Sequence, residues 1–411
     1  MLQASPAPAP GGPPRVRAAP RLLRLAGPGA IVAVAYVDPG NVATNVEAGA
    51  RFGPALLWVI GLAALAGMLV QHLSAKLGAA TGRSLPELCR ERYPRPVVRL
   101  LWAQAEVVAM ATDLAEIVGG AIALNLLFGL PLLAGALVTA AVGVLLLGLR
   151  REGRRHLATA FALMLLALVA AFAVQAAQVG VTATDVVAGL VPGLAADAAG
   201  GVDPEAVLLA TGIVGATVMP HVVYLHSALT RDARVRPRRH RRDVVVSLSV
   251  AATVNMAVLL VAAAALHVPG TEPLADTIEG AFGVLAQYGS AATLFAGALL
   301  VAALASACTG VHAGDAIMSG FLRRRIPIVV RRAVTVVPAL LVLTLPLDPT
   351  RALVISQVVL AVGLPFALVP LLHLTADRGL MGQHVNRRAT TVVGGVLAAT
   401  VSALAGLLLV G

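Results

Sequence analysis

Two short stretches of the sequence place possible metal ligands beside a proline inside otherwise apolar segments. The first extends from Ala35 to Asn41 and contains Asp38, Pro39 and Gly40. Proline has no N–H to donate to the carbonyl four residues earlier, here that of Ala35, and glycine permits irregular backbone angles. The stretch predicts a broken helix that presents a carbonyl, a carboxylate and an amide oxygen. The alternative is a simple proline kink in which Asp38 only caps the following helix.

The second stretch extends from Ala216 to His221 and repeats this arrangement. Pro220 leaves the carbonyl of Ala216 without its usual donor, and Met219 precedes the proline as Asp38 does in the first stretch. The candidate ligands are the side chains of Asp38, Asn41 and Met219 and the carbonyls of Ala35 and Ala216. Oxygen ligands alone suit Mg²⁺ or Ca²⁺, whereas a thioether favours softer ions such as Mn²⁺, Fe²⁺ and Cd²⁺. The alternative for Met219 is ordinary core packing.

Both stretches belong to a strongly apolar chain. Of its 411 residues, 58% are hydrophobic and 12% are charged, and the mean hydropathy is +0.88. This composition excludes an ordinary soluble globule and predicts a helical protein that crosses a membrane many times. The net charge of +11 does not indicate a nucleic-acid partner, because the basic residues lie in short connections and aromatic residues make up only 3%. A lipid bilayer is the expected partner of this basic surface.

Eleven apolar stretches are long enough to span a bilayer. They lie at residues 25–48, 54–79, 98–128, 131–149, 157–180, 205–229, 243–267, 286–321, 328–346, 351–375 and 389–410. The first and sixth carry the breaks, so spans 1–5 and 6–10 form two halves that enter the membrane from opposite sides. We predict an all-α membrane protein with two inverted five-helix repeats and an eleventh helix, forming one domain over residues 21–411. Residues 1–20, rich in Ala, Pro, Gly and Arg, are predicted to be a disordered cytoplasmic arm.

Arginine-rich connections alternate with acidic ones along the chain. They precede the first span and follow the second, fourth, sixth, eighth and tenth spans, whereas the opposite connections carry Asp and Glu. The positive-inside rule then predicts a cytoplasmic N-terminus and an extracellular C-terminus. Only Arg51 and Arg351 fall on the acidic side.

A second group of titratable residues lies within the spans. Asp113 and Glu116 are three residues apart, on one face of the third span. The other members of the group are His221, His226, Arg331 and Arg332. Together these residues are suited to a proton relay, and the alternative is a buried salt bridge that only fixes helix packing. The pattern gives no preference between the two arginines, and Arg332 is our working assignment.

The Asp-Pro-Gly-Asn of the first span and the Met-Pro-His of the sixth resemble the signatures of the Nramp family of divalent metal transporters. Residues 27–49, 212–229 and 356–370 also resemble that family, and the resemblance covers nearly the whole chain after residue 20. It implies the fold of LeuT-type transporters. It further implies that a bacterial cell membrane holds the protein, which imports Mn²⁺, Fe²⁺ and also Cd²⁺ together with protons by alternating access.

Residue by residue, the resemblance implies that the five ligands named above hold the metal and that Gln357 joins them in some states. It also implies a proton pathway through the acids of the third span, His221 and one arginine of the ninth. The metal is the cargo, so we expect no cofactor, no enzymatic activity and no obligate protein partner. Val222, Asn45 and Glu47 differ from the commonest residues of the family, and none of them is a proposed ligand.

Four other classes of protein are less compatible with these residues. A sodium- or proton-coupled amino-acid symporter of the same fold would leave the first break uncharged, unlike Asp38. A related Mg²⁺ transporter would lack Met219. An intramembrane enzyme would need a His-Glu-x-x-His helix or a paired nucleophile and base, and the sequence contains neither. A passive channel is disfavoured by the broken repeat, although proton coupling itself is not readable from sequence.

Overall fold

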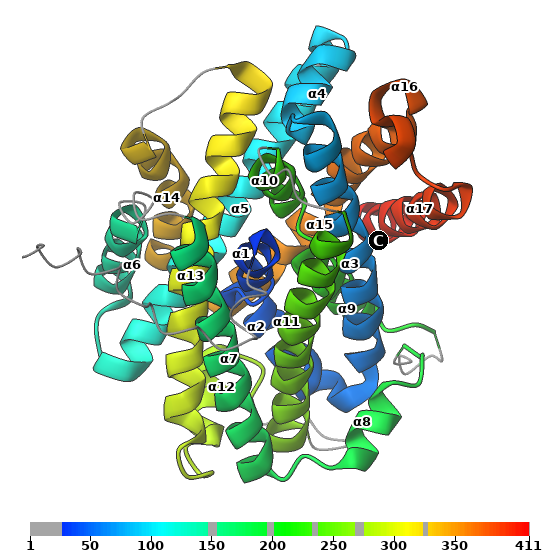
Figure 1. Cartoon of the computed structure of the whole chain (residues 1–411). Helices are drawn as coiled ribbons and strands as arrows, with labels where there is room; N and C mark the ends of the chain where they lie inside the picture. Colours follow the sequence, from blue (N-terminus) through cyan, green and yellow to red (C-terminus); the bar gives the residue numbers. More distant parts are fainter. Residues whose placement is uncertain are drawn as a thin grey trace, which may run out of the picture.

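The computed structural model describes residues 27–146, 154–194, 201–231, 237–267, 275–323 and 328–410, and every regular element in these ranges is a helix (Figure 1). The predicted arm at residues 1–20 lies outside the described residues. The two broken spans are α1 (Pro28–Ala35) with α2 (Pro39–Phe52), and α9 (Pro204–Val218) with α10 (Pro220–Thr230).

The remaining helices fall into a long and a short group. The long helices are α3 (Leu57–Thr81), α5 (Arg95–Phe128), α6 (Leu132–Leu146), α7 (Arg154–Val179), α11 (Pro237–Leu266), α13 (Ala291–Leu322), α14 (Ile328–Thr344), α15 (Pro349–Ala376) and α17 (Arg388–Val410). The short ones are α4 (Leu85–Arg92), α8 (Ala183–Gly189), α12 (Ile278–Leu285), α16 (Arg378–Met381) and the 3₁₀ helices η1 (Gly53–Leu56) and η3 (Gly382–His384).

Each of the eleven predicted spans coincides with one long helix or one broken pair. Eight helical stretches of the described chain are long and apolar enough to cross a membrane, one of which joins α2 to α3 through η1. Two shorter apolar stretches, Leu132–Leu145 and Arg332–Thr344, fall in the predicted fourth and ninth spans, and α1 begins the first. Length and hydropathy therefore located the spans correctly.

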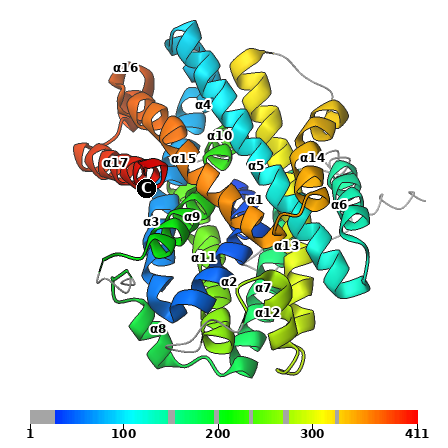
Figure 2. The same cartoon turned by 180° about the vertical axis from the view of Figure 1, so that it is seen from behind.

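The broken helices form the centre of the bundle. Helices α1, α2 and α10 are surrounded in both views by longer helices (Figures 1 and 2). Helices α3, α11 and α15 pack directly against them, α2 packs on α9, and α1 packs on α10. Every residue from Gly29 to Ala50 is buried, so most of the first span touches only protein.

The outer helices have the opposite character. Large apolar side chains are exposed on α6, α14 and α17, among them Leu137, Val334 and Val396. Such surfaces are unfavourable in water and favourable against lipid. The distribution of burial thus separates a lipid-facing shell from a central core that carries the two breaks.

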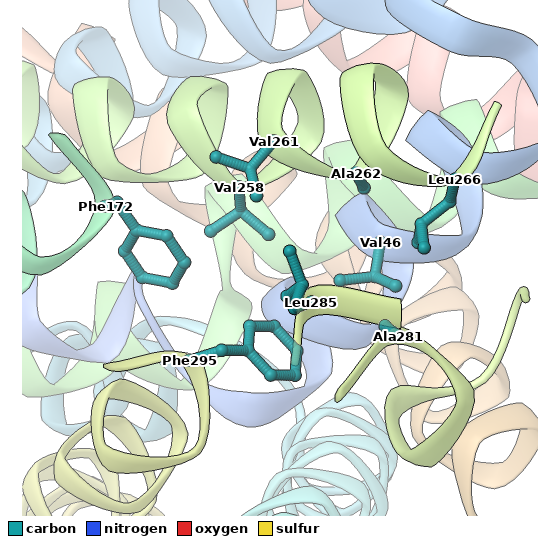
Figure 3. A pocket seen from close by; sticks show the side chains of 9 residues that line it. All are labelled: Val46, Phe172, Val258, Val261, Ala262, Leu266, Ala281, Leu285 and Phe295. Atoms are coloured by element: carbon teal, nitrogen blue, oxygen red, sulfur yellow. The ribbon is translucent and has the colours of Figure 1, made fainter. Parts of the chain in front are cut away.

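A small apolar cavity of about 10 Å³ lies between α2, α7, α11, α12 and α13 (Figure 3). Only hydrophobic side chains line it, including Val46, Phe172 and Leu285. Because these side chains offer no oxygen, nitrogen or sulfur ligand, the cavity is not a metal site.

Candidate metal centre

The first break separates α1 from α2 by three residues, and Asp38 caps the start of α2. Its Oδ1 accepts hydrogen bonds from the backbone N–H and from the side-chain Nδ2 of Asn41, each at 2.9 Å. The capping interpretation of Asp38 therefore describes one carboxylate oxygen. The other, Oδ2, is buried and has no hydrogen-bond partner among the described residues.

The second break consists of Met219 alone, which stands between the end of α9 and the start of α10 and is fully buried. One turn earlier, the carbonyl of Ala216 accepts a hydrogen bond from Asn41 Nδ2 at 2.9 Å. This amide thus contacts both breaks at once, Asp38 in the first and Ala216 in the second. The structure brings these predicted ligands together from segments 175 residues apart.

Gln357 of α15 closes the group from a third side. A Cβ added to Gly40 would lie 1.7 Å from Gln357 Nε2, so glycine is required for this side chain to rest on the first turn of α2. A Cβ added to Gly215 of α9 would lie 2.2 Å from the carbonyl oxygen of Gln357. Helix α15 therefore packs through Gln357 against both broken spans.

Three oxygens of this group are buried without a partner. They are Asp38 Oδ2, Asn41 Oδ1 and Gln357 Oε1, and no hydrogen bond reaches them from the described residues. Nor does any described cation pair with the Asp38 carboxylate within 4.0 Å. Buried acceptors of this kind are rare in folded proteins because each loses its hydration. A bound cation would satisfy them.

The predicted proton residues assemble in part. Arg332 Nη1 lies 2.5 Å from Asp113 Oδ1 and 3.6 Å from Glu116 Oε2, and all three side chains are buried. Ser306 Oγ donates a 2.9 Å hydrogen bond to Glu116 Oε1. The alternative assignment, Arg331, has a side chain outside the described part of the structure. The cluster joins α5, α13 and α14.

The two histidines lie in different places. Nδ1 of His221 is 3.3 Å from Thr112 Oγ1, the residue next to Asp113, so His221 adjoins the acidic cluster. His226 instead contacts Gln71 of α3, with Nδ1 3.0 Å from Oε1. The structure therefore does not bring His226 to the predicted acids, because it lies more than one turn further along α10 and faces α3.

A close helix contact connects the acidic cluster to the first break. A Cβ added to Gly119 of α5 would lie 2.1 Å from the Cβ of Pro39. The backbone of α5 therefore touches the first residue of α2, one turn after Glu116. Because α5 and Pro39 are in close contact, a displacement of Pro39 would also displace α5, the helix that carries Asp113 and Glu116.

An ion-pair network joins the C-terminal part of α2 to the first turns of α9 and α15. Arg351 Nη1 lies 3.0 Å from Glu47 Oε1 and 2.5 Å from Glu205 Oε1. Arg51 lies 3.3 Å from Glu47 and 2.7 Å from Asp276. These contacts explain why two arginines stand on the acidic side of the predicted topology, since both have carboxylate partners there.

Sequence reasoning missed several polar side chains that contact the site or its helices. Asn255 bonds to the first break, Ser306 bonds to Glu116, and Asp243 accepts hydrogen bonds at the start of α1. A usable signal existed for Asn255, because an amide within a long apolar span is unusual and marks a functional or packing contact. The partner of each residue is not readable from the local sequence.

Comparison with known protein families and relatives gives one consistent result. The family model described as natural resistance-associated macrophage protein-like, or Nramp, matches residues 29–411. The divalent metal cation transporter MntH of Deinococcus radiodurans is 47% identical over 408 residues, covering 97% of this chain and 91% of that protein. The MntH of Mycobacterium tuberculosis is 48% identical over 393 residues, covering 92% and 90%.

Solved structures agree with the fold. The manganese transporter of Eremococcus coleocola superposes with a TM-score of 0.82 at 33% identity, over 93% of this chain and 85% of that one. Mhp1, a nucleobase-cation-symport-1 transporter, shares the fold alone, with a TM-score of 0.55 at 14% identity over 89% and 80% of the two chains. The prediction of a LeuT-like fold, with two inverted five-helix repeats and an eleventh helix, is confirmed. This chain belongs to the Nramp family and is a multi-pass membrane protein that transports divalent metal ions.

Proposed function

We propose that the protein imports Mn²⁺ and Fe²⁺, and also Cd²⁺, coupled to proton movement, by alternating access. The metal ligands are Asp38, Asn41 and Met219, the carbonyls of Ala35 and Ala216, and Gln357. The observation that carries this proposal is the group of three unpartnered buried oxygens where the broken helices meet. The manganese transporter of Eremococcus coleocola, a relative of the same fold, supports Mn²⁺ as a substrate.

The Asn41 amide suggests how the site changes when an ion enters. Its Nδ2 now donates to two acceptors that are themselves candidate ligands, Asp38 Oδ1 and the Ala216 carbonyl. When a cation binds, it takes the place of the Asn41 Nδ2 group as the partner of these two acceptors. Rotation of the amide then turns Oδ1 toward the ion and releases both acceptors to bind it. Asp38 Oδ1 and the Ala216 carbonyl, which accept from Asn41 Nδ2 in the structure, would then both coordinate the ion.

Met219 supplies selectivity in this scheme. Mg²⁺ and Ca²⁺ prefer oxygen ligands, and Mg²⁺ gives up its water reluctantly, so a thioether in the sphere is a poor partner for both. Selectivity is a difference of affinities. A ligand that penalises the abundant hard ions therefore separates them from Mn²⁺, Fe²⁺ and Cd²⁺.

The proton carrier in this proposal is the acidic cluster beside Arg332. Two carboxylates share one guanidinium, so one carboxylate lacks a full counter-ion when both are ionised. Glu116 is the more distant of the two from Arg332 and is the group we assign to gain and lose the proton, with Ser306 and Gly310 shaping its position. His221, next to Thr112, extends the route toward the second break.

Orientation and gating complete the scheme. By the positive-inside rule, the arginine-rich connections support a cytoplasmic N-terminus and an extracellular C-terminus. The network around Arg351 then lies on the extracellular side, across the helices α2, α9 and α15 that must separate for metal to enter. The side chains in this network hold the outer entrance shut, and its opening alternates with opening toward the cytoplasm.

Uptake into proteoliposomes that contain a pH-sensitive dye tests the proposal. The ions compared are Mn²⁺, Fe²⁺, Cd²⁺, Mg²⁺ and Ca²⁺. The wild type should take up Mn²⁺, Fe²⁺ and Cd²⁺ in preference to Mg²⁺ and Ca²⁺. Asp38→Ala should abolish uptake of every ion that the wild type transports, because this residue is the only fixed negative charge in the proposed sphere. Asp185→Ala, which removes an acid in the first turn of α8, is the control and should transport normally. Robust Mn²⁺ uptake by folded Asp38→Ala protein would exclude this site.

A further inference from the structure

Helix α11 runs beside the whole length of the broken first span and contacts it at four levels. Asp243 accepts hydrogen bonds from the backbone N–H groups of Gly27 and Gly29, at 3.2 and 2.7 Å. Near the other end, the carbonyl of Leu259 would lie 2.4 Å from a Cβ on Gly49, and His267 Nδ1 is 3.1 Å from the Ala50 carbonyl. Helix α11 therefore supports both α1 and α2 and holds them in a fixed relative position.

Asn255 occupies the level of the break itself. Its Nδ2 donates to the carbonyl of Tyr36 at 2.7 Å, and its Oδ1 accepts from Asn45 Nδ2 at 3.1 Å. Both contacts are buried. Tyr36 is the C-cap residue of α1, and Asn45 lies two turns into α2. One side chain on α11 thus holds both sides of the interruption.

The contact with Tyr36 selects which carbonyls remain for an ion. The last carbonyls of a helix lack intrahelical donors and must find other partners. Asn255 takes up that of Tyr36. In a continuous helix the carbonyl of Ala35 would accept from residue 39, but that residue is Pro39, which has no N–H to offer. Because peptide units are planar and joined by few rotations, fixing one carbonyl restricts the orientation of the next.

We propose that Asn255 is a positioning residue for the metal centre: it fixes the geometry of the first break so that the Ala35 carbonyl and the Asp38 carboxylate converge on the ion. This inference rests on the metal site proposed above. Asn255 does not touch the ion and acts only through Tyr36 and Asn45. Its loss lowers affinity for metal because the ion must then order a looser break.

Asn255→Leu is the main test, since leucine has a similar volume and removes both hydrogen bonds. Mn²⁺ uptake by proteoliposomes should show a half-saturation concentration about tenfold higher, the size expected from one to two buried hydrogen bonds, with a maximal rate within about twofold of wild type. Asn45→Leu, which keeps the bond to Tyr36, should raise it about threefold. The control Thr253→Val alters the same helix at a hydroxyl that bonds only to Ser249 of α11, and it should match wild type.

A merely structural asparagine would lower the amount of folded protein without changing half-saturation. Titration of purified protein with Mn²⁺ in a calorimeter checks the same shift without transport. If Asn255→Leu does not give a monodisperse protein, Asn255→Ser replaces it, because serine is too short for either bond and leaves room for water. A wild-type half-saturation concentration in either folded variant overturns the proposal.

Asp38→Ala is measured in the same series to separate the two proposals. If Asp38→Ala is inactive and Asn255→Leu behaves as wild type, the metal site stands and the role of Asn255 is refuted. If Asp38→Ala transports normally, the metal site itself is refuted and the positioning role falls with it.

Discussion

Replacing Arg351 by methionine should make the extracellular entrance open far more often. Arg351 is the only described residue that pairs with acids from both α2 and α9, through Glu47 and Glu205. Methionine keeps an unbranched apolar side chain in place of the aliphatic part of arginine and removes the charge and the N–H donors. The closed arrangement then loses the bridge between these helices, whereas the open arrangement, in which water reaches the acids, loses little.

The size of the effect follows from the Glu47 contact. Two unit charges at 3.0 Å attract by about 5 kcal/mol at an effective dielectric constant of 20. Solvent screens part of this, because the Arg351 side chain is 36% exposed, but Glu47 is only 4% exposed. Glu47 also keeps Arg51 at 3.3 Å. A net cost of about 2 kcal/mol to the closed state is therefore expected, which corresponds to about a thirtyfold shift in population.

Thiol labelling measures this shift. Thr44 is fully buried on α2 and lies opposite Gly212 of α9, between the break and the ion-pair network. A Thr44→Cys reporter, in a chain whose buried Cys89 and Cys308 are replaced by alanine, reacts with an impermeant maleimide only when α2 and α9 part. Its labelling rate is proportional to the open population when opening is fast.

The expected result is labelling about thirty times faster with Arg351→Met than with arginine. Arg92→Met is the matched control, since it breaks a surface pair with Asp377 at the opposite end of the bundle, near α4 and α16 (Figure 1). That change should leave labelling as it is. Equal labelling rates with arginine and methionine at position 351 would show that the network does not hold α2 and α9 together.

Three further substitutions test other parts of the site. Glu116→Gln should keep metal binding but weaken metal-stimulated acidification and its pH dependence, because an amide cannot titrate; unchanged acidification would leave Glu116 a packing residue. Met219→Ala should keep appreciable Mn²⁺ uptake, lose more Cd²⁺ than Mn²⁺ affinity and admit competition by Ca²⁺ or Mg²⁺, and wild-type discrimination would contradict the thioether argument. Gly119→Ala should reduce Mn²⁺ affinity at least tenfold, because its Cβ would overlap Pro39; binding by calorimetry decides, and normal affinity would show that α5 can move away.

Local sequence was sufficient for the spans and the breaks, because both depend on hydropathy and on proline chemistry within one segment. It also singled out Asp113 and Glu116 and left the choice between Arg331 and Arg332 open, and the structure brings both acids and Arg332 into one cluster. Charged residues are so rare inside apolar spans that each such residue is conspicuous. For the same reason Arg51 and Arg351 stand out in the sequence as exceptions to the charge pattern, although the sequence does not identify their carboxylate partners.

Contacts between distant helices were not accessible in the same way. The position of His226 after the second break predicts a place near the acids, yet His226 contacts Gln71 of α3 instead. The roles of Asn255 and Asp243 depend on α11 lying beside the first span, more than two hundred residues earlier in the chain. A periodic pattern states which face of a helix is apolar, but it does not state which helix that face meets.

The capping of Asp38 bears on how the chain enters the bilayer during synthesis. Ribosomes produce the first span long before the sixth, so Ala216 and Met219 do not yet exist when Asp38 leaves water. Both hydrogen bonds to Asp38 Oδ1 come from Asn41, three residues away in the same segment. The carboxylate therefore carries part of its solvation into the membrane with it, which lowers the cost of insertion. The first span can therefore remain in the membrane with Asp38 bonded to Asn41 until the second half of the chain is synthesised and inserted.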